Sequence, residues 1–225
     1  MKTFRLESAG GCTSDTAFCA SYEVTYPLFQ QLSAAATDSL TRKISEAVDT
    51  GNPEQDTVSF ELAGKNFIAS FEDSKKEMPD LTMGWYYKVA LSVNVAADTL
   101  ISIQADNEFF TGGAHGGYGT TFINMNPVTG KRITLGDILK PGYDEVLQKE
   151  GEADFRKSQE LADTASYANA GFEFPNDKFV LNDNYGFTKN GIVFVFNVYE
   201  IAPYAMGAQE VHIPYARLKG WLKKD

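Results

Sequence analysis

The most unusual stretch of the sequence is TGGAHGGYG, Thr111–Gly119, in which five glycines surround His115. Glycine permits positive φ angles and lets the backbone approach a ligand closely, so such a stretch can form a binding loop. A phosphate-binding loop is excluded, because the GxGxxG pattern and a following Lys-Ser/Thr pair are both absent. We favour a shaped connection between two strands, with a ligand site as the alternative. The ligand site would consist of Gly112, Gly113, His115 and Tyr118.

A second unusual segment is NVYEIAPYAMGAQE, Asn197–Glu210, where a carboxylate directly follows an apolar run. A carboxylate in such surroundings either accepts hydrogen bonds from backbone amides or has a raised pKa, and the first is commoner. Tyrosine, methionine and carboxylate on one loop also match the composition of protein-binding surfaces, whereas the structural alternative is a tyrosine-packed turn. The candidate contact residues are Tyr199, Glu200 and Tyr204.

Patterns typical of catalysis or metal binding are scarce. His115 and His212 are the two histidines, and neither belongs to an HxH or HxxxH spacing that would predict a metal site. The GxSxG pattern of a serine nucleophile is absent as well. The enzymatic alternative is a hydrolase that uses His115 with the carboxylate of Glu200 or Asp106, provided that these groups converge in one pocket. We expect no metal and no cofactor, and we favour a function without catalysis.

The bulk composition predicts a folded protein with an acidic surface. Its 225 residues are 43% hydrophobic, which is enough to bury a core in one domain or two packed subdomains. The formal net charge of -10 disfavours binding to nucleic acid or anionic lipid and favours a basic partner. No apolar run reaches the roughly 18 residues of a membrane span, so we expect that the chain is not membrane-embedded. The start, MKTFRLES, carries Arg5 and Glu7 where a signal peptide would be apolar.

Two cysteines, Cys12 and Cys19, are close in sequence with glycine and serine around them. We predict a short-loop disulfide between them in an exported chain, and two free thiols in a cytosolic one. The spacing is too wide for a CxxC redox motif, and no other cysteine or nearby histidine completes a zinc site. The residues SAGGC, Ser8–Cys12, also resemble a lipoprotein cleavage site without its apolar stretch, so a lipid anchor on the native precursor is an open alternative.

The first part of the chain has the periodicity of helices. From Pro27 to about Asp49, apolar residues recur every four positions, which predicts an amphipathic helix that ends at Gly51–Pro53. A second helix is expected from near Glu54 to Lys76, with Val58, Leu62, Phe67, Ile68 and Phe71 facing inward despite Gly64. The apolar run Thr57–Leu62 has a strand as its alternative.

After Pro79 the period changes to two, which predicts strands. Tyr87–Val95 and Leu100–Ile103 should form a hairpin, Thr120–Met125 a third strand, and Asn126–Lys131 a turn, after which Thr134 caps a helical turn. A surface helix should follow at Gly142–Leu161. Further strands are expected at Phe179–Leu181, Tyr185–Phe187, Ile192–Val198 and Val211–Ile213, and a short helix at Tyr215–Lys224. The run IVFVFNVY is apolar on both faces and should be a central strand.

These elements predict an α+β fold, with early helices packed on an antiparallel sheet and a later β-rich part with short helices. We expect a subdomain boundary near residue 80. Residues 1–80 would form the helical part, whose sheet extends to about residue 110, and residues 81–225 the β-rich part.

Three segments carry a resemblance to a known family. WYYKV, FFTGGAHGGYGTTFINMNPVTGKRITLGDIL and IVFVFNVYEIAPYAMGAQEVHIPYARLK occur in an order that resembles the C-terminal domain of RsiV-type anti-sigma factor ectodomains. This resemblance covers residues 85–223. CASYEVTYPLF and the two helices after it are similar to the companion domain that occurs there and in front of PdaC-type peptidoglycan deacetylases.

The resemblance implies a non-catalytic α+β binding or sensing module in the periplasm or on the cell surface. In the deacetylases the reaction belongs to a separate catalytic domain, which this sequence does not contain. RsiV-type ectodomains sense lysozyme by binding it, and a basic lysozyme would suit the net charge of -10. We therefore expect a lysozyme-like protein or peptidoglycan as the partner, and no nucleic acid.

Overall fold

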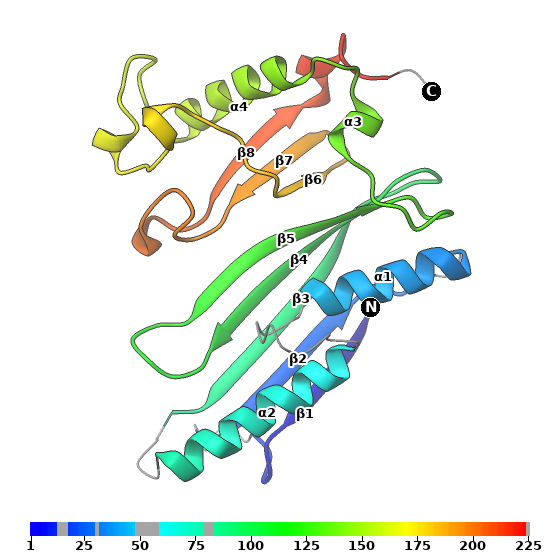
Figure 1. Ribbon diagram of the computed structural model, residues 1–225, viewed down its shortest axis with the longest axis vertical. Coiled ribbons are helices and arrows are strands. Elements are labelled where there is room, and N and C mark those ends of the chain that lie inside the picture. Colours follow the sequence, from blue (N-terminus) through cyan, green and yellow to red (C-terminus); the bar gives the residue numbers. More distant parts are fainter. Residues whose placement is uncertain (13–17, 30–31, 48–58, 79–82, 224–225) are drawn as a thin grey trace. The chain divides into compact units, whose positions relative to one another are not determined.

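The computed structural model describes residues 1–12, 18–29, 32–47, 59–78 and 83–223, and the predicted α+β class is confirmed (Figure 1). The chain divides into two compact units. Unit 1 comprises Met1–Ser92, Ala105–Gly119 and Val128–Gly130, and unit 2 comprises Val93–Gln104, Thr120–Pro127 and Lys131–Asp225. No helix in the described ranges is long and apolar enough to cross a membrane.

Five strands form a mixed sheet in the order β1-β2-β3-β4-β5. Their bounds are β1 Lys2–Glu7, β2 Ala20–Tyr26, β3 Trp85–Ala96, β4 Ile101–Phe110 and β5 Gly117–Met125. The strand β1 is antiparallel to β2, whereas β2 is parallel to β3. A parallel pair needs a long crossover, and the segment with both N-terminal helices supplies it. Sequence reasoning missed β1 and β2, although Phe4 and Leu6 alternate with polar residues.

The helix α1, Ala34–Ala47, buries Ala36, Leu40 and Ile44, as the spacing of four predicts. It begins later than the predicted start at Pro27. The Ser33 side chain accepts a hydrogen bond from the backbone N–H of Ala36 at 3.1 Å, which satisfies one of the unpaired donors at the helix start. The predicted end near Asp49 lies outside the described residues.

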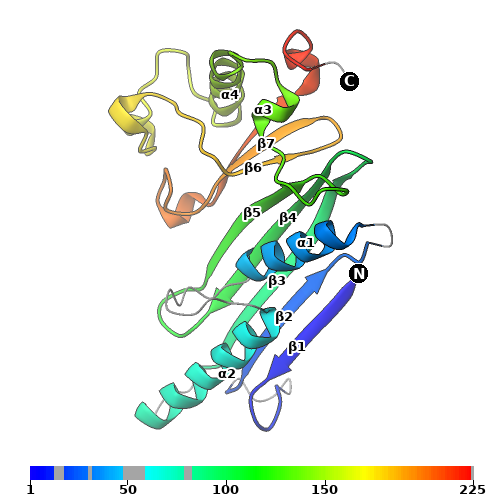
Figure 2. The ribbon, with the colours of Figure 1, turned by 45° about the vertical axis from the view of Figure 1, so that its right-hand side comes forward.

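The helix α2, Phe60–Glu77, packs on the same face of the sheet as α1 (Figure 2). The strand alternative for this region is wrong from Phe60 onward, and residues 48–58 lie outside the described part. Leu62, predicted to face inward, is 41% exposed, because the buried stripe runs through Ala63 and its neighbours. A Cβ on Gly64 would lie 2.7 Å from the Tyr22 ring, so this glycine marks the closest approach of helix and sheet.

The predicted hairpin of β3 and β4 is present, and the Ala97 amide donates to the Leu100 carbonyl across its turn. The predicted alternation of buried and exposed residues in β3 ends at Leu91, which is buried. Val93, two residues later, is 40% exposed. The turn after β5 is also present. There the Asn126 amide donates to the Lys131 carbonyl at 2.9 Å.

The later strands form a three-stranded sheet in the order β6-β7-β8, with bounds β6 Tyr185–Phe187, β7 Gly191–Phe196 and β8 Gln209–Pro214. Every residue of β7 is buried, which confirms the predicted central strand. The expected strand at Phe179–Leu181 is wrong, since the Leu181 amide donates to the Gln148 side chain instead of a neighbouring strand.

Two α-helices belong to the described part of unit 2. They are α3, Leu135–Ile138, and α4, Asp144–Ser158. Thr134 is the N-cap residue of α3, as predicted, and the Asp137 carboxylate accepts hydrogen bonds from the Thr134 amide and hydroxyl. These bonds lower the pKa of Asp137 below its ordinary value. The last predicted helix is shorter than expected and is a 3₁₀ turn, Tyr215–Leu218.

The predicted disulfide joins Cys12 to Cys19. Replacing both cysteines by serine should lower the free energy of unfolding by about 2.5 kcal/mol, because an open chain gains the conformational entropy of this short loop. Urea titrations of the oxidised protein and the double variant measure the difference. An unchanged unfolding midpoint in the variant would show that the bridge does not constrain the unfolded chain.

Candidate binding surfaces

The glycine-rich segment connects β4 to β5 at one end of the sheet in unit 1. Gly112 and Gly113 have φ angles of +87° and +111°, which only glycine adopts readily. The His115 ring is exposed, and its Nδ1 lies 2.8 Å from the Gly116 carbonyl oxygen. Because a carbonyl oxygen only accepts, this contact requires the proton on Nδ1.

The remaining glycines of this connection have a packing reason. A Cβ on Gly116 would lie 2.7 Å from the Phe109 carbonyl oxygen, and a Cβ on Gly117 would collide with the Phe109 ring. These contacts support the interpretation as a shaped connection. Tyr118, the fourth candidate residue of this segment, is 38% exposed at the start of β5.

One donor near this connection was not predicted. The indole Nε1 of Trp85 is buried and has no hydrogen-bond partner among the described residues, and a Cβ on Gly112 would lie 3.6 Å from it. The partners proposed for a catalytic His115 are distributed over the two units. Asp106 lies half-buried on β4 in unit 1, whereas Glu200 belongs to unit 2, so the hydrolase alternative stays a prediction.

The second candidate segment connects β7 to β8 in unit 2. The Glu200 carboxylate accepts hydrogen bonds from the Asn197 amide at 2.9 Å and from the Asn182 side chain at 2.7 Å. It is therefore hydrogen-bonded to the backbone, the first of the two alternatives considered for this carboxylate. The bond to Asn197 closes a tight turn in which Tyr199 has a φ of +66°.

Asparagine side chains fix the base of this connection to β5. Asn197 accepts a hydrogen bond from the Thr120 amide at 2.7 Å and donates one to the Thr120 carbonyl at 3.1 Å. The Asn184 side chain donates to the carbonyls of Thr120 and Val195. Sequence reasoning missed these anchors, because an isolated asparagine in a sequence more often marks a turn.

The outer part of the connection exposes large side chains. Tyr199 is 65% exposed, and its ring lies 5.6 Å from the Tyr204 ring, centroid to centroid. Met206 is 39% exposed. A Cβ on Gly171 would lie 3.4 Å from the Met206 sulfur, so the β7–β8 connection packs against the segment around Gly171.

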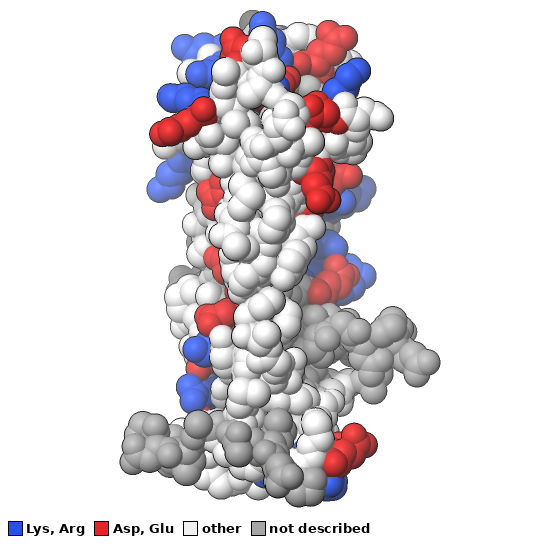
Figure 3. Space-filling model, turned by 90° about the vertical axis from the view of Figure 1, so that its left-hand side faces the viewer, with Lys and Arg blue, Asp and Glu red and all other residues white. Residues whose placement is uncertain are grey.

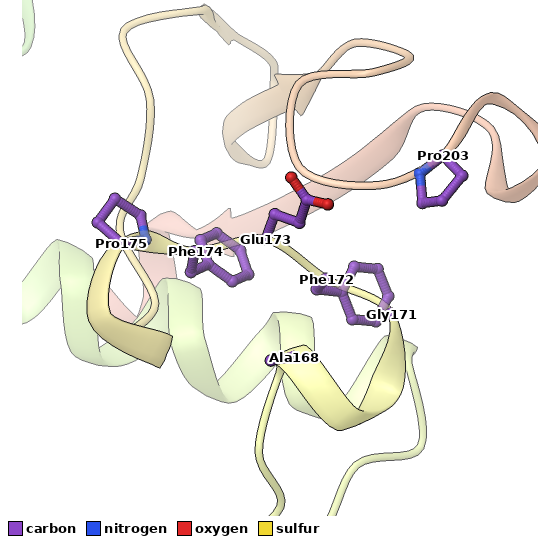
Figure 4. Close-up of a pocket in the computed structure, with 7 residues that line it drawn as sticks. All are labelled: Ala168, Gly171, Phe172, Glu173, Phe174, Pro175 and Pro203. Carbon is purple, nitrogen blue, oxygen red and sulfur yellow. The ribbon is translucent and has the colours of Figure 1, made fainter.

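A pocket of about 650 Å³ lies beside these residues, within unit 2 (Figure 4). It is lined by Ala168, Gly171, Phe172, Glu173, Phe174, Pro175 and Pro203. The Glu173 amide donates to the Ile201 carbonyl at 2.7 Å, which ties one wall of the pocket to the β7–β8 connection. Its volume falls in the range of ligand sites. Sequence reasoning missed this pocket because residues 168–175 carry no recognisable motif.

The pocket rests on the aromatic core of unit 2. The Phe172 and Phe174 rings pack edge-on against the buried Phe155 ring, at 4.9 and 5.4 Å between centroids. The Asp177 carboxylate accepts a hydrogen bond from the Ala168 amide at 2.8 Å, and this bond contributes most to lowering the pKa of Asp177. The packing of Phe172 and Phe174 on Phe155 and the bond from the Ala168 amide to Asp177 therefore hold the pocket lining in place.

Figure 3 shows the side of the chain that lies on the left in Figure 1, where the β7–β8 connection is found. An uncharged area lies there between charged side chains of both signs. Within the described ranges, no three His, Cys, Asp or Glu side chains are grouped so that they could hold a metal ion. The chemistry available at this surface is contact by aromatic rings and proline, with Glu173 as the charged residue of the pocket.

Two family models match the chain. Residues 136–216 match a family described as a protein of unknown function (DUF3298), and residues 13–118 match one described as Deacetylase PdaC. The predicted resemblance is supported at this level, and the narrower assignment to RsiV-type ectodomains stays a prediction. Among curated proteins no significant match was found.

Two solved structures of DUF3298 family members resemble the chain. The protein from Bacteroides fragilis is 22% identical with a TM-score of 0.71, and the alignment covers 99% of this chain and 93% of that one. The protein from Pseudomonas aeruginosa PAO1 is 24% identical with a TM-score of 0.61, and the alignment covers 99% and 94%. These likenesses establish the fold.

Proposed function

We propose that the protein is a non-catalytic, extracytoplasmic binding or sensing module whose ligand is a basic, wall-active protein of the lysozyme type. Its contact surface is the β7–β8 connection with the adjoining pocket. The observation that carries this proposal is the exposed tyrosine in a left-handed backbone conformation, Tyr199.

The backbone of Tyr199 adopts a costly conformation, although most of its side chain is exposed. A left-handed φ costs an L-residue roughly 1–2 kcal/mol, and strained residues of this kind cluster at functional sites. A side chain that is 65% exposed recovers little hydrophobic free energy within the chain. Glu200 nevertheless holds the turn closed through the Asn197 amide. A strained turn that presents an aromatic ring to solvent is well suited to protein recognition, where tyrosines are common anchors.

The proposed location and partner have independent support. The disulfide between Cys12 and Cys19 is typical of an oxidising compartment. The net charge of -10 would accelerate association with a basic protein and favour it over acidic competitors. The resemblance to RsiV-type ectodomains supplies lysozyme as the first protein to test and peptidoglycan as the alternative ligand.

Replacing Tyr199 by asparagine should separate stability from binding. Asparagine tolerates a left-handed φ, so the free energy of unfolding should stay constant or rise by up to about 1 kcal/mol. Affinity for hen egg-white lysozyme should fall at least tenfold, because the variant loses an exposed aromatic anchor. Calorimetric titration at two salt concentrations measures the affinity, and urea unfolding measures the stability.

The matched control is Leu28→Asn, which removes an apolar side chain of similar exposure, 63%, from unit 1. This control should bind lysozyme as tightly as the unmodified chain. The proposal fails if lysozyme and soluble peptidoglycan fragments both give no heat with the unmodified chain. If only peptidoglycan binds, the module recognises the wall itself and the protein ligand is wrong.

A further inference from the structure

The pocket of unit 2 combines apolar walls with one carboxylate. Two phenylalanines, two prolines, an alanine and a glycine line it, and Glu173 is its charged residue. The Glu173 side chain extends toward the connection that carries Pro203 (Figure 4). Across the described part of the chain, no side chain or amide is bonded to the Glu173 carboxylate. An exposed carboxylate above an apolar floor can receive a ligand cation without breaking an internal bond.

This lining discriminates between classes of ligand. A sugar ring presents several hydroxyls that need hydrogen-bond partners, and unpaired polar groups in a site reduce affinity. The lining contains no amide or hydroxyl side chain that could pair with them. A long cationic side chain suits it better, because its methylene stem packs on apolar surface while its charged head stays at the wet rim.

The ring-rich walls favour arginine over lysine. A guanidinium is planar, stacks on flat rings and can donate two parallel hydrogen bonds to one carboxylate. The pocket offers the Glu173 carboxylate for pairing, and its lining includes the aromatic rings of Phe172 and Phe174. A lysine ammonium is a compact, strongly hydrated charge and gains less from such walls.

We infer that this pocket receives an arginine side chain of the protein ligand, with Glu173 as its counter-charge; this inference rests on the proposed function. The β7–β8 connection then contributes two adjacent contacts. Tyr199 contacts the ligand surface through its exposed ring, and the pocket beside it binds one positively charged side chain. Specificity for basic proteins would depend on Glu173 more than on the net charge of the chain.

The test uses the full chain labelled with ¹⁵N and a capped peptide, acetyl-Gly-Arg-Gly-amide. The backbone amides of Gly171, Glu173 and Met206 should shift with a dissociation constant in the millimolar range, on the order expected for one side chain. The peptide with citrulline, which keeps the shape without the charge, should bind at least fivefold more weakly. The lysine peptide should fall between the two.

Glu173→Gln should remove the preference for arginine over citrulline, whereas Glu145→Gln should keep it. Glu145 is the matched control because it is an exposed glutamate of the same unit and does not line the pocket. Amide shifts elsewhere in the spectrum report whether each variant keeps its fold. Equal binding of arginine and citrulline, or pocket shifts with chitotetraose and none with arginine, would overturn the inference.

Parallel titrations with lysozyme separate the two proposals. If lysozyme binds and Glu173→Gln leaves its affinity unchanged, the binding function stands and the arginine pocket is wrong. If the arginine peptide binds at the pocket and no wall-active protein binds, the pocket stands and the proposed ligand is wrong. A fivefold or greater loss of lysozyme affinity in Glu173→Gln alone supports both.

Discussion

Replacing Phe155 by alanine should lower the free energy of unfolding by about 4 kcal/mol, the largest effect we expect from one substitution. The ring is fully buried on α4 and contacts the rings of Tyr167, Phe172, Phe174, Phe179 and Phe196. Its loss leaves a cavity that rigid neighbouring rings cannot fill. Urea unfolding followed by circular dichroism measures the change.

The same substitution should also loosen the pocket, because Phe172 and Phe174 line it and rest on Phe155. Faster hydrogen exchange at the Glu173 amide, which bonds to the Ile201 carbonyl, would report this effect. Val180→Ala is the control, since Val180 is 46% exposed in the same unit and should cost less than about 0.5 kcal/mol. A loss below about 1 kcal/mol for Phe155→Ala would contradict the role of this ring.

Replacing Gly191 by alanine should cost about 2–3 kcal/mol for a different reason. A Cβ at the start of β7 would collide with the Ile213 carbonyl oxygen and lie 2.8 Å from the Pro214 Cα. Both are backbone atoms of β8, so no side-chain rotation relieves the contact. The pairing of β7 with β8 must shift, and with it the connection that presents Tyr199.

Thermal unfolding and lysozyme affinity should therefore both decrease in Gly191→Ala. Gly220→Ala is the matched control, because nothing lies within 4 Å of a Cβ built there and its backbone needs no positive φ. That substitution should be neutral or slightly stabilising, since alanine reduces the entropy of the unfolded chain. If the two variants have the same unfolding midpoint, the close approach of β7 and β8 does not require glycine at position 191.

Local patterns were sufficient where burial and periodicity agree. Every residue of β7 is apolar and every one is buried, so the central strand could be predicted without its neighbours. The Thr134 cap and the Cys12–Cys19 bridge depend on residues that lie close in sequence. The same holds for the backbone-bonded state of Glu200, whose partner amide is three residues away.

Long-range partners explain most failures. The edge strand β1 is recognisable only beside β2, because a half-buried strand of six residues carries few apolar positions. The prediction of a strand at Phe179–Leu181 was wrong because the Leu181 amide donates its hydrogen bond to the Gln148 side chain of α4. No residue near Leu181 in sequence indicates that competition.

The sequence by itself determined the class of fold, the disulfide and the two segments rich in glycine and tyrosine, because periodicity, cysteine spacing and composition act over short stretches of chain. Only the tertiary structure decided how those segments are held. The packing of Phe109 gives Gly116 and Gly117 a structural reason. The turn that exposes Tyr199 is held by a hydrogen bond from Asn182 to Glu200 and by one from the Thr120 amide to Asn197. The pocket around Glu173 exists because residues about 30 apart in sequence, Gly171 and Pro203, meet above the aromatic core.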